Sequence, residues 1–178
     1  MRSPLIVVAL GPLAFLLVAC ASTSRFQTYA GPVRPAEEVA LLRASVEWIR
    51  IFSTADHVTT VMEIDQQAID FGSADELEIP VGLHKVLFRY ERTRISPLCV
   101  PSGCIWYATR SEPSYSELEF QAGARRHYAA FGFADSFESR PYIWLTDLDS
   151  CVVVAGEHPP LKSPPCKEDW DGVIRGSG

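Results

Sequence analysis

Short runs of alternating apolar and polar residues fill most of the chain after residue 44 and predict β-strands. Glu76-Leu77-Glu78-Ile79 alternates strictly, and the other runs are rich in β-branched and aromatic residues. Turn-forming residues separate the runs every 8–12 residues or so, which is typical of sandwiches and barrels. We expect nine or ten strands, over residues 46–52, 59–65, 68–71, 76–79, 84–92, 104–110, 115–121, 125–134, 142–146 and 151–155. The pattern therefore predicts an all-β fold, an antiparallel β-sandwich.

Residues 35–43 form the one stretch with a good helical pattern. Pro35 stands at its start, Glu37 and Glu38 fill the first turn, and Arg43 closes it. Proline is favoured at a helix start, acids stabilise the first turn and a cation stabilises the last. We therefore expect one short N-terminal helix that caps the sandwich.

Two segments of the chain resemble each other at an offset of 41 residues. Leu77–Gly82 and Leu118–Gly123 each combine an alternating strand with a Gly-containing turn, and each precedes a strand that carries a histidine, His84 or His127. Glycine supplies the positive φ that such a turn needs. We expect two similar β-hairpins in which each histidine has the structural role of a hydrogen bond to the turn.

The first twenty residues have the organisation of an export signal. A basic start precedes the uncharged apolar run Leu5–Val18, which Pro12 interrupts. Fourteen residues of helix rise about 21 Å, short of the roughly 30 Å of a bilayer core. The pattern predicts a signal peptide over residues 1–19 rather than a permanent membrane span.

The run ends in Leu17-Val18-Ala19-Cys20, which resembles the lipobox of bacterial lipoproteins. The resemblance implies cleavage before Cys20, lipid on its thiol and acylation of the new amine. Three acyl chains would make attachment to the membrane effectively permanent. Ala21, rather than Asp, implies sorting to the outer membrane, with the protein facing the periplasm. The alternative is an ordinary signal peptide followed by a chance cysteine.

Composition divides the remaining chain into three parts. Residues 20–34 are small and polar and predict a flexible tether. Residues 35–157 carry the strand pattern of the sandwich domain. Residues 158–178 form a proline-rich C-terminal tail.

Four cysteines follow Cys20, and an oxidising compartment favours their pairing. They permit three connectivities. We favour Cys99–Cys104 and Cys151–Cys166, which close short loops rich in proline, the second fastening the tail to the last strand. A zinc site is the competing interpretation, but the spacing lacks the tight pairs of structural zinc sites.

A second resemblance covers about 25 residues. Ile64-Asp65-Gln66-Gln67, followed by Leu77–Val86, resembles the core of PEGA-type surface domains, although that family favours glycine where Gln66 stands. The segment Tyr29–Leu41 is similar to the entry segment of small proteobacterial lipoproteins. Both resemblances imply a small Ig- or PEGA-like sandwich with a binding or architectural role, and neither implies a catalytic residue.

Charge and motifs narrow the function. A net charge of −6 argues against a nucleic-acid partner, which requires a basic face. The chain has no nucleophile elbow, Walker loop, dinucleotide fingerprint or paired-histidine zinc motif, so we expect no catalytic residue, metal or cofactor.

Aromatic residues within the expected strands predict the core. They are Trp48, Phe52, Phe88, Tyr90, Trp106, Phe120, Phe131 and Trp144. Candidate binding residues are the strand-end tyrosines and the cations that we place along one strand face. They are Tyr107, Tyr128 and Tyr142, with Arg89, Arg92 and Arg94. A simply solvated face is the plainer interpretation of the arginines.

These observations favour a non-enzymatic outer-membrane lipoprotein, a binding or structural module of the cell envelope. Its expected partners are the membrane, through the N-terminal lipid, and an envelope protein or peptidoglycan. One alternative is an envelope hydrolase built on Asp56, His57, Glu63 or Asp65. Another is a small-ligand carrier with an apolar cavity.

Overall fold

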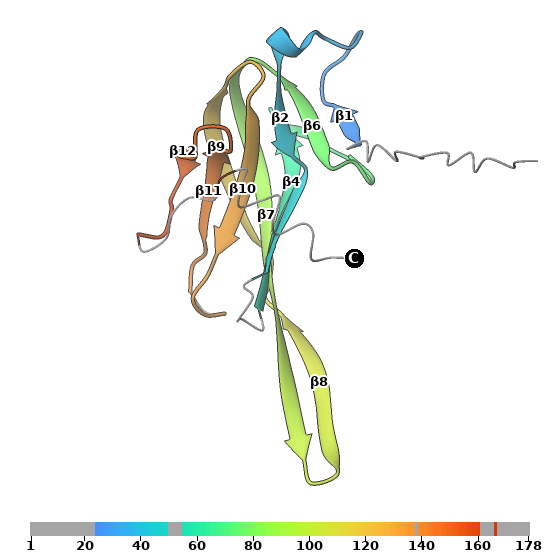
Figure 1. Cartoon of the computed structure of the whole chain (residues 1–178), viewed down its shortest axis with the longest axis vertical. Helices are drawn as coiled ribbons and strands as arrows, with labels where there is room; N and C mark the ends of the chain where they lie inside the picture. The colour runs from blue at the N-terminus through green and yellow to red at the C-terminus, as the bar shows by residue number, and fades with distance from the viewer. Residues whose placement is uncertain (1–23, 50–54, 138, 161–165, 167–178) are drawn as a thin grey trace, which may run out of the picture.

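The computed structural model describes residues 24–49, 55–137, 139–160 and 166, and they form two β-sheets of six strands each (Figure 1). Sheet A contains, in spatial order, β1 (Arg25–Gln27), β6 (Glu76–Pro80), β2 (Val39–Arg43), β10 (His127–Phe133), β11 (Tyr142–Asp147) and β12 (Val152–Gly156). Sheet B contains β3 (Ser45–Ile49), β4 (Ala55–Ile64), β7 (Gly82–Val100) and β8 (Gly103–Arg110), with β5 (Gln67–Ala68) on β4 and β9 (Ser114–Ala122) on β7. The predicted all-β sandwich is confirmed.

Sheet A is mixed rather than purely antiparallel. β1 pairs with β6 in parallel, and β2 pairs with β10 in parallel, whereas the other neighbours in this sheet are antiparallel. Parallel neighbours need a long connection between them. Here the chain passes through sheet B between β2 and β10, which supplies that connection.

The predicted N-terminal helix is wrong over most of its length. Only Ala36–Glu38 turn helically, as a single 3-10 turn, and Val39–Arg43 form β2 instead. This strand lies between β6 and β10, and Ala40 and Leu42 are fully buried. A strand buried on both faces loses its alternation and reads as a continuous apolar run, and short apolar runs are ambiguous between helix and strand.

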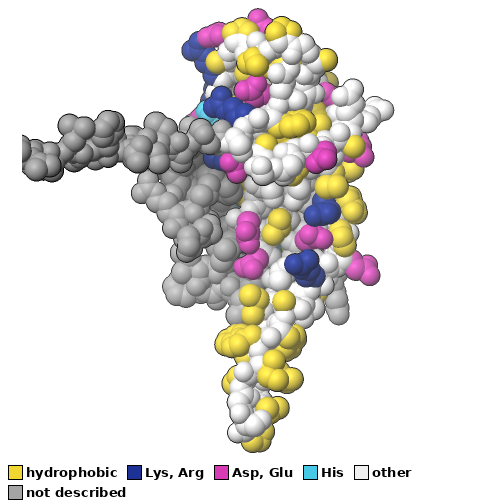
Figure 2. Space-filling model, turned by 90° about the vertical axis from the view of Figure 1, so that its right-hand side faces the viewer, with side chains coloured by type: hydrophobic (Ala, Val, Ile, Leu, Met, Phe, Trp, Pro, Cys, Tyr) yellow, Lys and Arg dark blue, Asp and Glu magenta, His cyan; other side chains and the backbone are white. Residues whose placement is uncertain are grey.

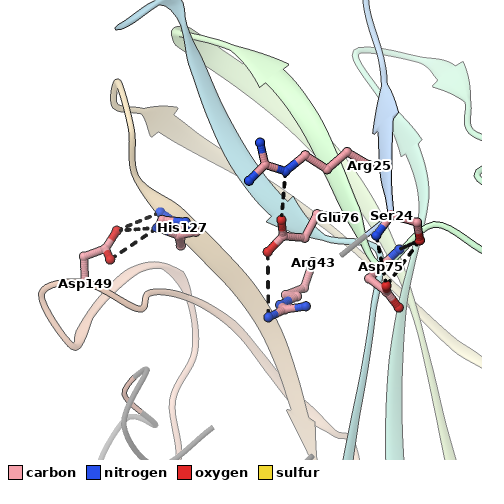
Figure 3. Close-up of polar contacts among 7 residues, drawn as sticks. All are labelled: Ser24, Arg25, Arg43, Asp75, Glu76, His127 and Asp149. Atoms are coloured by element: carbon pink, nitrogen blue, oxygen red, sulfur yellow. Dashed lines mark hydrogen bonds and ion pairs between the residues drawn. The ribbon is translucent and has the colours of Figure 1, made fainter. Parts of the chain in front are cut away.

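The predicted flexible tether of residues 20–34 includes a strand, β1. Ser24 holds the start of β1 on the loop before β6, because its hydroxyl donates to the backbone oxygen of Ser73 at 3.0 Å and contacts the Asp75 carboxylate at 3.2 Å. Glu76 then lies between the guanidinium groups of Arg25 and Arg43, at 3.3 and 3.7 Å (Figure 3). These contacts fix β1 to β6 and β2.

The two matching segments are not hairpins. β6 and β7 are consecutive strands in different sheets, and so are β9 and β10, so each Gly-containing turn carries the chain across the sandwich. Gly82 has a φ of 146°, which side-chain-bearing residues rarely adopt. The strand and turn pattern was read correctly, but sequence alone does not distinguish a turn within a sheet from one between sheets.

The core consists of two clusters, one between the sheets and a smaller one on the other face of β10 and β11, because alternate residues of these two strands belong to different clusters. The larger one includes Phe88, Phe120 and Tyr128, and the smaller one includes Phe131 stacked on Trp144 at 5.9 Å between ring centroids. Most of the aromatics predicted for the core are buried in it. They are Phe88, Tyr90, Phe120, Phe131 and Trp144.

Both predicted disulfides are confirmed. Cys99 is bonded to Cys104, and Cys151 to Cys166. The second bond fastens the tail beside β12, where the His158 ring also meets the Trp144 ring edge-on at 4.9 Å. The signal peptide, Cys20, Phe52 and the rest of the tail lie outside the described residues, as does the side chain of Trp48.

Candidate functional site

Strand β7 is longer than the sandwich to which it belongs. It pairs with β9 up to Tyr90 and with β4 up to Arg94, and beyond that point β8 is its only partner among the described residues. The result is a two-stranded ribbon, residues 95–108, which we call the arm. It runs about 17 Å from its first pair to its last, and it projects from one end of the sandwich (Figure 1).

The arm contains no Asp, Glu, Lys, Arg or His, and its large apolar side chains face water. Trp106 and Ile105 are 65% and 63% exposed, and Leu98 is 55% exposed. Figure 2 shows hydrophobic side chains along the arm, whereas the charged side chains in that view lie on the sandwich. A ribbon this thin has no core of its own, so its apolar surface marks a site of interaction.

Alternate residues of a strand point to opposite faces, so the register divides the side chains of the arm between its two faces. One face carries Val100, the Leu98–Ile105 pair and then Tyr107. The opposite face carries the disulfide and then Trp106, paired with Pro97. The arm is therefore apolar all round, with one aromatic ring on each face.

The tip of the arm is closed tightly. A two-residue turn, Pro101-Ser102, joins the Val100–Gly103 pair, and the Cys99–Cys104 bond links the next pair covalently. An isolated two-stranded hairpin is marginally stable in water. The disulfide supplies the constraint that packing cannot, and it keeps the tip in strand register.

The arm joins the sandwich at a cluster of arginine and aromatic side chains. The guanidinium of Arg92 lies 4.8 Å from the centre of the Phe137 ring, and Phe137 also lines a surface hollow of about 660 Å³ with Arg94 and Tyr107. Arg94 and Arg110 are exposed, and neither forms an ion pair within the described residues. The root of the arm therefore carries two exposed guanidinium groups.

Only one of the three candidate binding tyrosines is well exposed. Tyr107 is half-exposed on the arm. Tyr128 is buried in the core, where its ring meets Phe120 edge-on, and burial raises the pKa of its phenol. Tyr142 is partly buried against the smaller core cluster. Position near a strand end does not decide exposure, because the facing sheet covers some ends and not others.

The three candidate arginines do not share one face, which corrects the predicted cationic strip. The alternation of β7 places Arg92 and Arg94 on the face opposite Arg89. Arg89 pairs with Glu91 at 3.5 Å, which neutralises it locally. Of the three, Arg94 is the exposed one, and it lies next to Tyr107 in the hollow.

The residues proposed for a hydrolase are not brought together. Asp56 and His57 are neighbours on β4 and point to opposite faces, and about 25 Å of extended chain separates His57 from Asp65. His57 is buried and its Nδ1 lies 2.6 Å from the Tyr90 hydroxyl. Burial of Tyr90 raises its pKa to about 12, so it is a hydrogen-bonding partner inside the core. Glu63 lies further along β4, next to a register shift.

Asp65 and His84 form a structural clamp. His84 is buried, its Nδ1 lies 2.7 Å from the Asp65 carboxylate, and its Nε2 lies 2.8 Å from the Pro80 carbonyl oxygen. The clamp ties the turn after β4 to the turn before β7.

His127, at the corresponding position of the second matching segment, also contacts a carboxylate. Its backbone N–H donates to the Asp149 carboxylate at 2.9 Å, and its ring Nδ1 lies 3.0 Å from the same group (Figure 3). Asp149 belongs to the turn between β11 and β12. The expected hydrogen bond to the Gly-containing turn is therefore found for His84, which contacts Pro80, whereas His127 contacts the turn between β11 and β12 instead.

The described residues contain no group of three or more side chains suited to hold a metal ion. Nor does any helix within them have the length and apolarity of a membrane span.

Most of the arm is not predicted by the sequence pattern. The pattern gives no role to Leu98, Val100 and Ile105, places Trp106 in the core, and favours a bent loop around the disulfide. The signal was present: fifteen consecutive residues, 95–109, carry no charge, and Arg94 and Arg110 flank them. An uncharged run with aromatic residues ordinarily belongs to a protein core, so this composition favours a buried segment.

Comparison of the chain with protein-family models, with curated proteins and with solved structures finds no match.

Proposed function

We propose that the protein is a non-enzymatic binding module of the cell envelope that engages its partner through the β7–β8 arm. The observation that carries this proposal is the exposed, uncharged, disulfide-closed arm. A ribbon with no core of its own gains apolar contacts only from another molecule. The sandwich, with its clamped turns and filled core, serves as the rigid mount.

The lipobox resemblance supplies the location in this proposal. Cleavage before Cys20 and acylation there would hold the protein in the outer membrane, facing the periplasm. The two disulfides support an oxidising compartment such as the periplasm. Three residues lie between Cys20 and Ser24, where the described structure begins, and these four steps of chain reach at most about 14 Å. An anchored protein would therefore stay close to its membrane.

Site-directed photo-crosslinking in living cells tests the proposal. A photoreactive amino acid replaces Trp106 on the arm, and in a matched control it replaces Val152, which is 54% exposed on β12. We expect an envelope component to be captured from position 106 and not from position 152. Capture from neither position, or from both equally, would remove the arm from the proposed function.

The anchor is tested separately by the intact mass of the protein in the membrane fraction. We expect a chain that begins at acylated Cys20. A protein that keeps residues 1–19, or that carries no lipid, contradicts the location. For the Cys20→Ala variant, no acylated protein should be found in the membrane fraction. The capture from position 106 should also be lost.

A further inference from the structure

The arm carries three kinds of side chain in a fixed order from its tip to its root. Apolar side chains come first, with Val100, Leu98 and Ile105 in the three pairs nearest the turn. The aromatic rings of Trp106 and Tyr107 follow, about 10–14 Å from the last pair. Arg94 and Arg110 come after them, about 20–24 Å from it.

This order matches the layers of a phospholipid surface. Acyl chains accept apolar side chains, the boundary between chains and headgroups favours tryptophan and tyrosine, and anionic headgroups attract arginine. Arginine side chains are long and keep their charge in water while their stems lie along apolar surface. The two arginines at the root are therefore placed to meet phosphate groups when the tip enters the acyl layer.

Each face of the arm repeats the series. One face combines the Leu98–Ile105 pair, Tyr107 and Arg94, and the other combines the disulfide, Trp106 and Arg110. A protein that docks on one face of a ribbon would leave the other apolar face in water. A lipid surface surrounds both faces, so the repetition favours lipid over a flat protein partner.

Backbone chemistry limits the depth of insertion. Over residues 95–108, both outer edges of the ribbon carry N–H and C=O groups that pair with no other described strand. Such groups cost several kcal/mol each in hydrocarbon. The arm can therefore enter the outermost acyl region but cannot span it, which agrees with the position of Trp106 about 10 Å from the last pair.

We propose that the arm inserts its tip into the surface of a phospholipid membrane, with Trp106 and Tyr107 at the boundary of the acyl layer and Arg94 and Arg110 on anionic headgroups. This inference rests on the proposed function, because it names the partner of the same arm. The protein would then have two contacts to lipid. One is the anchor at Cys20, and the other is the arm that projects from one end of the sandwich.

Depth-dependent fluorescence quenching tests the insertion. The acylated full-length protein is reconstituted into vesicles of phosphatidylethanolamine and phosphatidylglycerol that contain phospholipids brominated near the top of the acyl chain. Emission of the Trp106→Phe variant is subtracted from that of the wild type, which isolates Trp106 from the other tryptophans. We expect the brominated lipids to remove most of the Trp106 emission and acrylamide in the water to remove little.

Two sets of variants assign the effect to the arm. Ile105→Asp should abolish quenching of Trp106 by lipid, whereas the control Val152→Asp, at a similarly exposed site on β12, should leave it unchanged. Arg94→Gln combined with Arg110→Gln should shift the ratio of inserted to free arm about 30-fold toward the free arm in anionic vesicles. The same double change should have little effect in vesicles of phosphatidylcholine alone.

The outcomes separate this inference from the proposed function. Unquenched Trp106 together with a protein captured from position 106 in cells would overturn the lipid inference and leave the binding module standing. Capture of a second copy of this chain would do the same and would make the arm a self-association element. Unquenched Trp106 with no capture at all would overturn both.

Discussion

Asp65 shows how one carboxylate connects separate turns of the sandwich. It accepts hydrogen bonds from the Lys85 backbone N–H at 3.0 Å and from the His84 ring at 2.7 Å. Partial burial opposes ionisation, but these two donors outweigh burial and lower the pKa of the carboxyl group below its ordinary value of 3.8. Folding therefore favours the charged form of Asp65.

We expect Asp65→Asn to lower the free energy of unfolding near neutral pH by about 1–2 kcal/mol, because the carboxylate is half-exposed and screened. A lowered pKa contributes stability above the unfolded-state value that is lost as the pH falls through the folded-state value. The difference between wild type and variant should therefore shrink below about pH 4. Urea unfolding over a pH series measures it, and an equal difference at all pH values would contradict the clamp.

Residues of this kind were partly predictable. The sequence match places His84 and His127 after corresponding turns and predicts a hydrogen bond to each turn, which His84 makes and His127 replaces with a contact to Asp149. Their carboxylate partners, Asp65 and Asp149, could not be named, because 19 and 22 residues separate each pair and only the fold brings them together.

At the scale of elements, β2 differs most from its expected form. The proline and the acids before this strand, with Arg43 at its end, agree with the preferences of a helix over residues 35–43. Charges at helix ends contribute only about 1 kcal/mol or less. Burial of Leu42 and its neighbours between β6 and β10 contributes more, since each large apolar side chain contributes about 1.5–3 kcal/mol when fully buried. Tertiary packing therefore overrides the local preference.

We expect Leu42→Ala in β2 to lower the free energy of unfolding by about 2–5 kcal/mol, because the side chain is fully buried and a cavity would remain. Leu83→Ala is the matched control, since Leu83 is 62% exposed on β7. The control should cost about 0.5 kcal/mol or less. Chemical denaturation of both variants measures the contrast, and equal losses would mean that residues 39–43 do not form a central strand.

At the scale of the whole molecule, the two sheets are in close contact at Gly132. A side-chain carbon added at this position of β10 would overlap the ring of Tyr90 and would lie 2.9 Å from the hydroxyl of Thr59. Tyr90 belongs to β7 and Thr59 to β4, so glycine on sheet A makes room for side chains of sheet B. The spacing of the layers depends on this residue.

Gly132→Ala should lower the free energy of unfolding by about 1–3 kcal/mol through overpacking. Gly123→Ala is the control, because the added carbon would first meet the flexible side chain of Arg126, at 3.2 Å. Thermal unfolding of the two variants distinguishes them. Equal midpoints would show that the sheets can separate at no cost, contrary to the close contact described.

The all-β class, the approximate bounds of most strands, both disulfides and the hydrogen bond of His84 to its turn follow from the sequence. These features depend on the local alternation of apolar and polar residues, on turn-forming residues and on the short spacing of the paired cysteines. All three are properties of residues close together in the sequence. It also carries the expectations of a signal peptide and a lipid on Cys20, which concern residues outside the described structure.

Tertiary structure alone decided which strands share a sheet, that β2 is a strand, and that the turns at Gly82 and Gly123 cross between sheets. It also decided that residues 95–108 project as an arm. An apolar residue is buried only if another element covers it, and β7 extends beyond β4 and β9, which would have covered it. The composition of the arm is that of a core, and only its position in the fold makes it a surface.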